Sequence, residues 1–122
     1  MRYMLLIYND PSHEPSFGTP EFEAMMAGYM AINRQMKEDG VLVAGEALQG
    51  IDTATSLRLR GGKVETMDGP YAETREHLGG YYVIDVPDLD TALRYAALIP
   101  SAGFGTIETR PLLNYDPAGH KA

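Results

Sequence analysis

One segment near the middle of the chain gathers the residue types that can do chemistry. It reads Asp68-Gly69-Pro70-Tyr71 and continues with Glu73, Arg75, Glu76 and His77. Together these side chains offer hydrogen-bond donors and acceptors of both charges. Because proline fixes its own φ and restricts the residue before it, we expect an extended Gly69 and a stiff corner. A stiff corner is typical of a binding-site wall, and equally of an ordinary turn with an Asx cap.

A second candidate acid, Glu46, ends the apolar run 41–45. A carboxylate withdrawn from water at the end of a strand suits a general base, whereas an exposed strand end is the alternative. We therefore predict Asp68 and Glu46 as the catalytic residues.

Four further residues are predicted to bind a ligand: Tyr71, Glu73, Tyr81 and Arg110. Arg110 shares a strand face with Glu108, so it either holds an anionic part of the ligand or pairs with that glutamate. Tyr81 either lines a cavity or fills a dimer core.

One amide lies on the apolar stripe of the first predicted helix. Asn33 is placed eleven residues after Phe22 on that stripe. Its side chain either bonds a backbone group or faces a pocket, since buried amides are normally hydrogen-bonded.

Several kinds of site are excluded. The chain has no cysteine, so it has no disulfide, thiolate nucleophile or zinc–thiolate site. The three histidines, His13, His77 and His120, have no ligand spacing, and we predict no metal and no cofactor. No phosphate-binding loop and no serine in a strained elbow is present either.

The bulk composition indicates one ordinary globular domain. A chain of 122 residues and 13.4 kDa is short for two domains, so we predict a single domain over residues 1–122. The formal net charge of -7 disfavours nucleic acid and anionic lipid as partners. No apolar run approaches the roughly 20 residues that cross a bilayer, and residues 3–8 end too soon for a signal peptide. We therefore expect a cytoplasmic protein.

Helices and strands alternate along the chain. Thr19-Pro20 predicts the start of a helix that ends before Gly40, and Asp88 caps a second helix that ends at Pro100. The first helix should bury a stripe from Phe22 to Met36, and the second helix should bury Leu89, Ala92, Leu93, Ala96 and Ile99. Strands are predicted at 3–8, 41–46, 56–60, 64–67, 81–86 and 106–112, followed by an irregular tail at 113–122.

Two pairs of features refine this reading of the strands. Gly61-Gly62 predicts a tight hairpin turn, and Gly45 predicts a bulge or a close backbone approach. Tyr3–Tyr8 and Tyr81–Val86 are apolar at both odd and even positions, which is typical of central strands covered on both faces.

The predicted fold is α+β: a ferredoxin-like βαββαβ unit with an inserted hairpin. Two helices cover one face of such a sheet and leave the other face bare. We expect a second copy to cover it, so that a homodimer forms a dimeric α/β barrel. The alternative is that long loops fold across the face.

The chain resembles a known family. Asp68-Gly69-Pro70-Tyr71 and the segments 72–76 and 78–82 are similar to the signature of the DGPF-domain branch of the YCII-related superfamily. Residues 1–8, 45–48, 87–90 and 108–111 fit the same pattern. Tyr71 replaces the usual Phe, and His77 stands where the pattern has Gln.

The resemblance implies a ferredoxin-like, dimeric α+β barrel. Some relatives resemble enzymes that eliminate HCl from chlorinated aromatics with a His–Asp pair, and genes of this branch often accompany extracytoplasmic-function sigma factors. The usual histidine lies on the first helix, where this chain offers only Met25 to Met30.

Two functions follow as hypotheses. The first is a homodimer that binds a small organic molecule in an interior cleft, with acid–base or elimination chemistry. The second is a non-catalytic regulatory or interaction module of an extracytoplasmic-function sigma-factor circuit.

Overall fold

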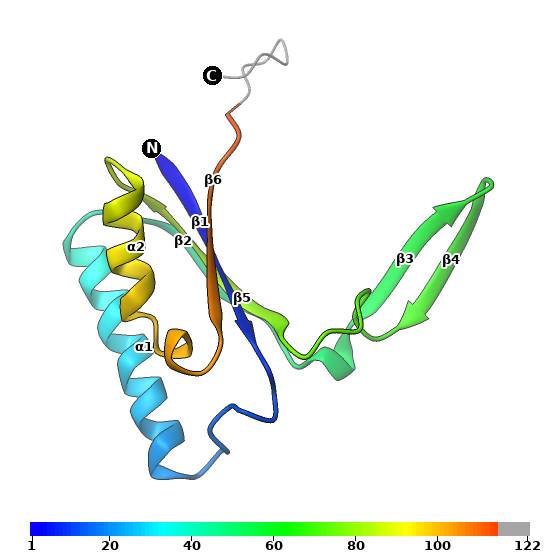
Figure 1. Ribbon diagram of the computed structural model, residues 1–122, viewed down its shortest axis with the longest axis horizontal. Coiled ribbons are helices and arrows are strands. Elements are labelled where there is room, and N and C mark those ends of the chain that lie inside the picture. Colours follow the sequence, from blue (N-terminus) through cyan, green and yellow to red (C-terminus); the bar gives the residue numbers. More distant parts are fainter. Residues whose placement is uncertain (115–122) are drawn as a thin grey trace.

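The computed structural model describes residues 1–114, which form an α+β fold (Figure 1). One antiparallel sheet has the strand order β2-β5-β1-β6, and two helices pack against it. The strands are β1 (Arg2–Asn9), β2 (Leu42–Ala47), β5 (His77–Asp85) and β6 (Thr106–Pro111), and the helices are α1 (Pro20–Glu38) and α2 (Leu89–Leu98). This arrangement is compatible with a ferredoxin-like fold. The predicted irregular tail lies outside the described residues from 115 onward, and so does His120.

The predicted helix ends are confirmed. The Thr19 hydroxyl accepts a hydrogen bond from the backbone N–H of Phe22, and Pro20 is the first residue of α1. Beyond the end of α1, Gly40 has φ of 71°. At the start of α2, the Asp88 carboxylate accepts from the backbone N–H of Thr91 at 2.8 Å.

The sheet has two unlike faces because side chains alternate along each strand. Tyr3, Leu5 and Ile7 of β1 point toward the helices and are buried. Ile84 and Tyr82 of β5 lie on the same face, where they are the cross-strand partners of Tyr3 and Leu5. Residues of the opposite parity form the second face, which no helix covers (Figure 1). The two central strands are those predicted.

Side chains from both helices complete the core over the first face, but not all of them are the expected ones. Ile32 and Met36 of α1 and Ala92 and Ala96 of α2 are buried, as is Ile99 directly after α2. The prediction was wrong for Leu89 and Leu93, which are about half exposed. Ala92 and Ala96 lie one turn apart on the side of α2 that packs against the sheet, and their small side chains allow a close approach. Leu89 and Leu93 lie on an adjacent side of the helix that is more exposed.

A hairpin projects from the domain as an arm (Figure 1). Strands β3 (Thr55–Arg60) and β4 (Lys63–Asp68) form a separate two-stranded sheet. Gly61 and Gly62, with φ of 56° and 76°, make its turn as predicted.

One face of this arm is apolar and exposed. The side chains of Leu57, Leu59 and Val64 are between 58% and 64% exposed. Because a lone two-stranded hairpin is marginally stable in water, contact of this face with a partner would stabilise the arm.

The corner at Asp68 differs from the prediction. Gly69 has φ of 94° rather than an extended φ, a conformation open to glycine at little cost. Its N–H donates to the carbonyl of Ala54 at 2.7 Å, and its carbonyl accepts from the Ser56 hydroxyl. These two bonds close the base of the arm and decide the turn. The strand predicted to begin at Tyr81 begins four residues earlier, at His77. The end of the motif therefore lies inside β5.

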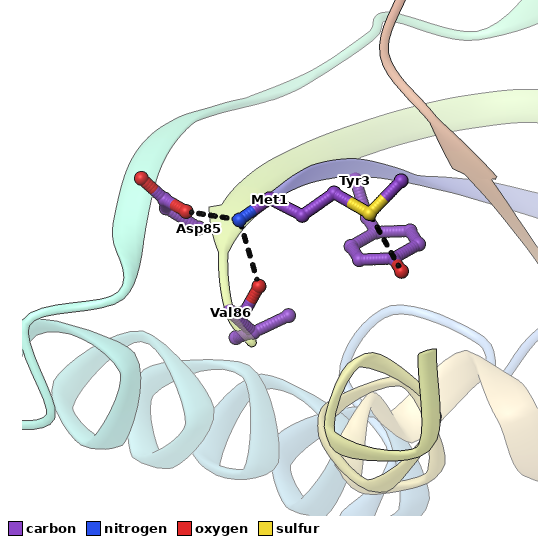
Figure 2. Close-up of polar contacts among 4 residues, drawn as sticks. All are labelled: Met1, Tyr3, Asp85 and Val86. Atoms are coloured by element: carbon purple, nitrogen blue, oxygen red, sulfur yellow. Dashed lines mark hydrogen bonds and ion pairs between the residues drawn. The ribbon is translucent and has the colours of Figure 1, made fainter. Parts of the chain in front are cut away.

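The start of β1 is tied to the end of β5. The amino group of Met1 donates to the Asp85 carboxylate and to the carbonyl of Val86, both at 3.0 Å, while the Tyr3 hydroxyl donates to the Met1 sulfur (Figure 2). In the part of the chain described here, neither helix combines the length and apolarity required to span a bilayer.

Replacing Gly105 by Ala should destabilise the fold. A Cβ at this position would collide with the backbone carbonyl of Tyr8 and lie 3.2 Å from the carbonyl of Ser101, and neither backbone atom can move aside cheaply. We expect a loss of about 1–3 kcal/mol in the free energy of unfolding, measured by denaturant titration at fixed protein concentration. Gly103→Ala, where a Cβ meets nothing within 4 Å, is the matched control. Equal stability of the two variants would contradict this packing.

Candidate functional site

A cavity of about 380 Å³ lies between α1 and the sheet. Its walls come from β1, α1, β2, β5 and the short 3₁₀ helix Pro100–Gly103. Ile7, Met25 and Met26 supply apolar side chains. The volume is within the range of small-molecule sites, which are largely apolar with a few placed polar groups.

Two hydrogen-bonded pairs supply polar groups in the walls. The hydroxyls of Tyr29 and Ser101 are 2.5 Å apart, and Ser101 is 2% exposed. The Tyr82 hydroxyl donates to Asn33 Oδ1 at 2.6 Å. Of the two alternatives for Asn33, the structure therefore shows the one in which the amide faces the cavity.

Burial raises the pKa of both phenols of the cavity. Desolvation raises the pKa of Tyr82 to about 12, and the neighbouring Tyr29 adds to this effect. Burial also raises the pKa of Tyr29, partly offset by its hydrogen bonds with Ser101, and the charge of Glu14 raises it further. At neutral pH both groups are neutral phenols rather than phenolates, so neither is a ready general base.

Glycines keep the backbone wall of the cavity thin. A Cβ on Gly45 would lie 2.7 Å from the ring of Tyr82, and a Cβ on Gly79 would lie 2.8 Å from Asn9 Nδ2. Both side chains therefore rest directly on glycine backbone. The close approach predicted at Gly45 is confirmed, and the register of β2 shifts between Leu42 and Ala44.

Asn9 and Glu14 form the polar end of the cavity. Asn9 Nδ2 donates to Glu14 Oε1 at 2.8 Å, whereas the buried Asn9 Oδ1 has no hydrogen-bond partner within the described residues. The charge of Glu14 is the smallest of the causes that raise the pKa of the Tyr29 phenol.

Two of the six predicted site residues border this cavity. Glu46 and Tyr81 lie at its edge and oppose each other across the β2–β5 ladder. They have the parity opposite to Gly45 and Tyr82, so their side chains project from the sheet face that the helices do not cover. Arg110 has the same parity as Glu108, which neighbours Tyr81 across Leu6, and thus belongs to that open face too.

The remaining predicted residues lie around the base of the arm. Asp68 and Glu73 border a shallow surface concavity that also includes Arg75 and His77. Tyr71 is 77% exposed, and the Arg58 guanidinium lies 6.0 Å from its ring centroid. Each of these side chains has ready access to solvent.

Arg110 pairs with Glu108 in the described structure. Arg110 Nε lies 4.0 Å from Glu108 Oε2, and both side chains are largely exposed. This is the pairing alternative, and an exposed ion pair of this kind contributes little to stability.

Sequence reasoning missed four residues of the cavity: Asn9, Glu14, Tyr29 and Ser101. Tyr29 was assigned to the helix stripe as core, whereas Asn9, Glu14 and Ser101 lie outside the predicted helices and strands. The only available signal was a tyrosine within a methionine-rich stripe. Among residues 1–114, no three His, Asp or Glu side chains are grouped in a way that would hold a metal ion.

Two comparisons relate the chain to known proteins. A family model described as the YCII-related domain matches residues 1–116. An uncharacterised protein of Rhizobium meliloti (strain 1021) is 39% identical over 119 residues, which cover 96% of each chain.

Tyr82→Phe should change how stability depends on pH. The pKa of Tyr82 is raised in the folded protein, so its contribution is complete below the ordinary value near 10 and is lost as the pH rises toward 12. We expect the thermal midpoint of the wild type to fall more steeply between pH 10 and 12 than that of the variant. At pH 7 the variant should lose about 1 kcal/mol, because the bond to Asn33 is absent. Parallel declines at high pH would show that Tyr82 is not withdrawn from water.

Proposed function

The chain belongs to the YCII-related domain family, and from this premise we propose that it is a cytoplasmic homodimer that binds a small organic molecule in the cavity between α1 and the sheet. The observation that carries the proposal is the cavity itself. A concavity of this size, lined by apolar side chains and two hydrogen-bonded phenols, is typical of a small-molecule site.

Within the family we assign the chain to the DGPF-type branch. The support is the motif Asp68-Gly69-Pro70-Tyr71, which occupies the return from the arm toward β5. A glycine suits the first turn position after Asp68, because Gly69 has φ of 94°.

The proposed dimer joins the open faces of two sheets. Met4, Leu6 and Tyr8 of β1 and Tyr81 of β5 are only half-buried there, although their strands are central. A second copy presents the same apolar surface by symmetry and would complete a barrel. The apolar face of the arm adds surface that a second copy can bury.

Dimer formation also bears on the acid–base hypothesis. Glu46, Tyr81 and Arg110 share the open face, so a second subunit would withdraw them from water together. Because these side chains project from the face opposite the cavity, this hypothesis puts the reaction between the two open sheet faces. There Glu46 serves as the general base, and Arg110 stabilises an anionic part of the reacting molecule. Asp68, Tyr71 and Glu73 are proposed to border the entrance from the base of the arm.

The second candidate function is a non-catalytic module of an extracytoplasmic-function sigma-factor circuit. The favouring observation is that no histidine lies on α1 or lines the cavity, so the His–Asp pair that the resemblance implies is missing. A projecting arm with an apolar face suits contact with another protein. Turnover of a bound molecule that requires Glu46 would favour the enzyme over the module.

Leu6→Glu should separate the subunits. Leu6 is half-buried on the open face, so a charge there is tolerated in a monomer and costly between two sheets. We expect sedimentation of the wild type at about twice 13.4 kDa and of the variant near that mass, with unchanged far-ultraviolet circular dichroism. Ala31→Glu, on the exposed side of α1, is the control and should remain dimeric. A monomeric wild type would remove the dimer from the proposal.

Met26→Trp should block ligand binding. Met26 lines the cavity and is 45% exposed, so a larger side chain can fill the space without overpacking the core. In a fragment screen followed by calorimetry, we expect compounds that bind the wild type to lose at least about tenfold in affinity, or 1.4 kcal/mol. Met30→Trp, one turn along α1 and outside the cavity lining, should bind like the wild type. If every hit binds both variants equally, the cavity is not the ligand site.

A further inference from the structure

The arm formed by β3 and β4 carries its apolar side chains on one face. In the ladder, Leu57 lies opposite Thr66 and Leu59 lies opposite Val64, so these four side chains project to the same side. The two leucines and the valine are each more than half exposed. Within the described residues, β3 and β4 pair only with each other. A contiguous exposed apolar face of this kind is typical of a protein contact site.

The tip of the arm concentrates positive charge. Arg58, Arg60 and Lys63 lie in the segment 58–63, and all seventeen acidic residues of the chain lie outside that segment. Arg60 and Lys63 are direct cross-strand partners, and like charges at such positions repel each other. Neither forms an ion pair with an acidic side chain among residues 1–114. An acidic partner surface would therefore relieve this repulsion.

The arm is continuous with the open face of the sheet. It projects on the side of the sheet away from the helices (Figure 1). At its base, Pro70 and Tyr71 line a shallow, largely apolar concavity together with Tyr8 and Leu78. Tyr8 lies on the open face, and Leu78 is its cross-strand partner. A second copy docked on the open face therefore lies beside the arm.

The arm is too long to end between two packed sheets. Each of its strands has six residues and extends about 20 Å, whereas facing sheets pack about 10 Å apart. The arm therefore reaches past the partner's sheet to the level of the partner's helices. In Figure 1 its tip lies toward the end of the domain opposite to the start of α1. A two-fold rotation that reverses the strand direction would bring the start of the partner's α1 to the level of this tip.

The surface around the start of α1 complements the arm. Residues 3–33 contain no lysine or arginine. Four acidic side chains lie in this stretch: Asp10, Glu14, Glu21 and Glu23. Between them Phe17 is 89% exposed, and its ring meets Phe22 edge to face with 5.3 Å between the centroids. An exposed aromatic ring flanked by carboxylates matches an apolar ribbon with a basic tip.

We propose that the arm docks on a second copy of this chain, at the surface around the start of the partner's α1. Its apolar face packs against Phe17 of the partner subunit. Arg60 and Lys63 flank the turn, and their long side chains carry the charges past the tip to the partner's acidic residues. Two-fold symmetry forms this contact twice. The inference rests on the proposed homodimer and goes beyond it, because it gives the arm a function and identifies the surface that receives it.

Photo-crosslinking from the arm tests the docking surface. The chain has no cysteine, so Thr66→Cys supplies a single attachment point for benzophenone-maleimide on the apolar face. We expect a covalent dimer on denaturing gels, in which the label is joined to a peptide from residues 10–23 of the other subunit. The same label on Ala97→Cys, at an exposed position of α2, is the control and should give no covalent dimer.

Paired leucine variants measure how much the arm contributes to the dimer. Leu59→Glu places a charge on the apolar face, and Leu98→Glu makes the same change on α2 at a leucine of matched exposure, 57% against 58%. We expect the dissociation constant of the dimer, measured by sedimentation equilibrium, to rise at least about tenfold for Leu59→Glu and to stay within about twofold for Leu98→Glu. The double variant Arg60→Gln, Lys63→Gln should also weaken the dimer and reduce its sensitivity to salt.

The possible results distinguish this inference from the proposed function. If the wild type is a monomer, the proposed dimer and the docked arm fail together. If Leu6→Glu dissociates the dimer while Leu59→Glu behaves like Leu98→Glu and labelled Thr66→Cys gives no covalent dimer, the dimer stands and the docked arm is wrong. A crosslink to a segment other than 10–23 would overturn the docking surface.

A basic two-stranded ribbon is also a known means of binding nucleic acid, which the acidic remainder of this chain disfavours. Binding of the wild type to duplex DNA or RNA that is lost in the Arg60→Gln, Lys63→Gln variant would assign the arm to nucleic acid instead of a second copy.

Discussion

The alternation of side chains along β1 and β5 is the constraint on which the rest of the structure depends. These two central strands send Tyr3, Leu5 and Ile84 beneath the helices and send the residues between them to the other face. Since a shift of one residue would exchange the two sets, the register is strongly specified by the buried face. Both the cavity under α1 and the uncovered face follow from this division of the sheet.

The cavity depends on the absence of side chains as much as on their presence. Gly45 and Gly79 allow Tyr82 and Asn9 to lie flat against the backbone, and any Cβ there would push these side chains into the open space. The bond from Tyr82 to Asn33 then joins the sheet to α1 beside the cavity. The same phenol, with its pKa raised by burial, remains a donor at neutral pH. The site is therefore preorganised for hydrogen bonding and has no ready phenolate base.

Local signals predicted the elements well, and long-range contacts account for the errors. Thr19, Asp88 and the Gly61-Gly62 turn each act within a few residues, and each was read correctly. Gly69 was misread, because its conformation is held by bonds to Ala54 and Ser56 across the arm. Leu89 and Leu93 were misread because a helical stripe defines a face only to within a rotation, and the sheet selects which part of the stripe is buried.

The sequence by itself determined the α+β class, the central strands, the ends of the helices and the family, because these depend on periodicity, capping and motifs that local residues encode. Only the tertiary structure decided which polar residues meet. Asn9, Glu14, Tyr29 and Ser101 come from four separate segments and converge because the sheet and α1 bring them together. Conversely, Asp68, Glu46 and Arg110 are rich in chemistry along the chain, yet they lie on the arm, at the cavity edge and on the open face. Proximity in space depends on packing, and spacing along the chain does not encode it.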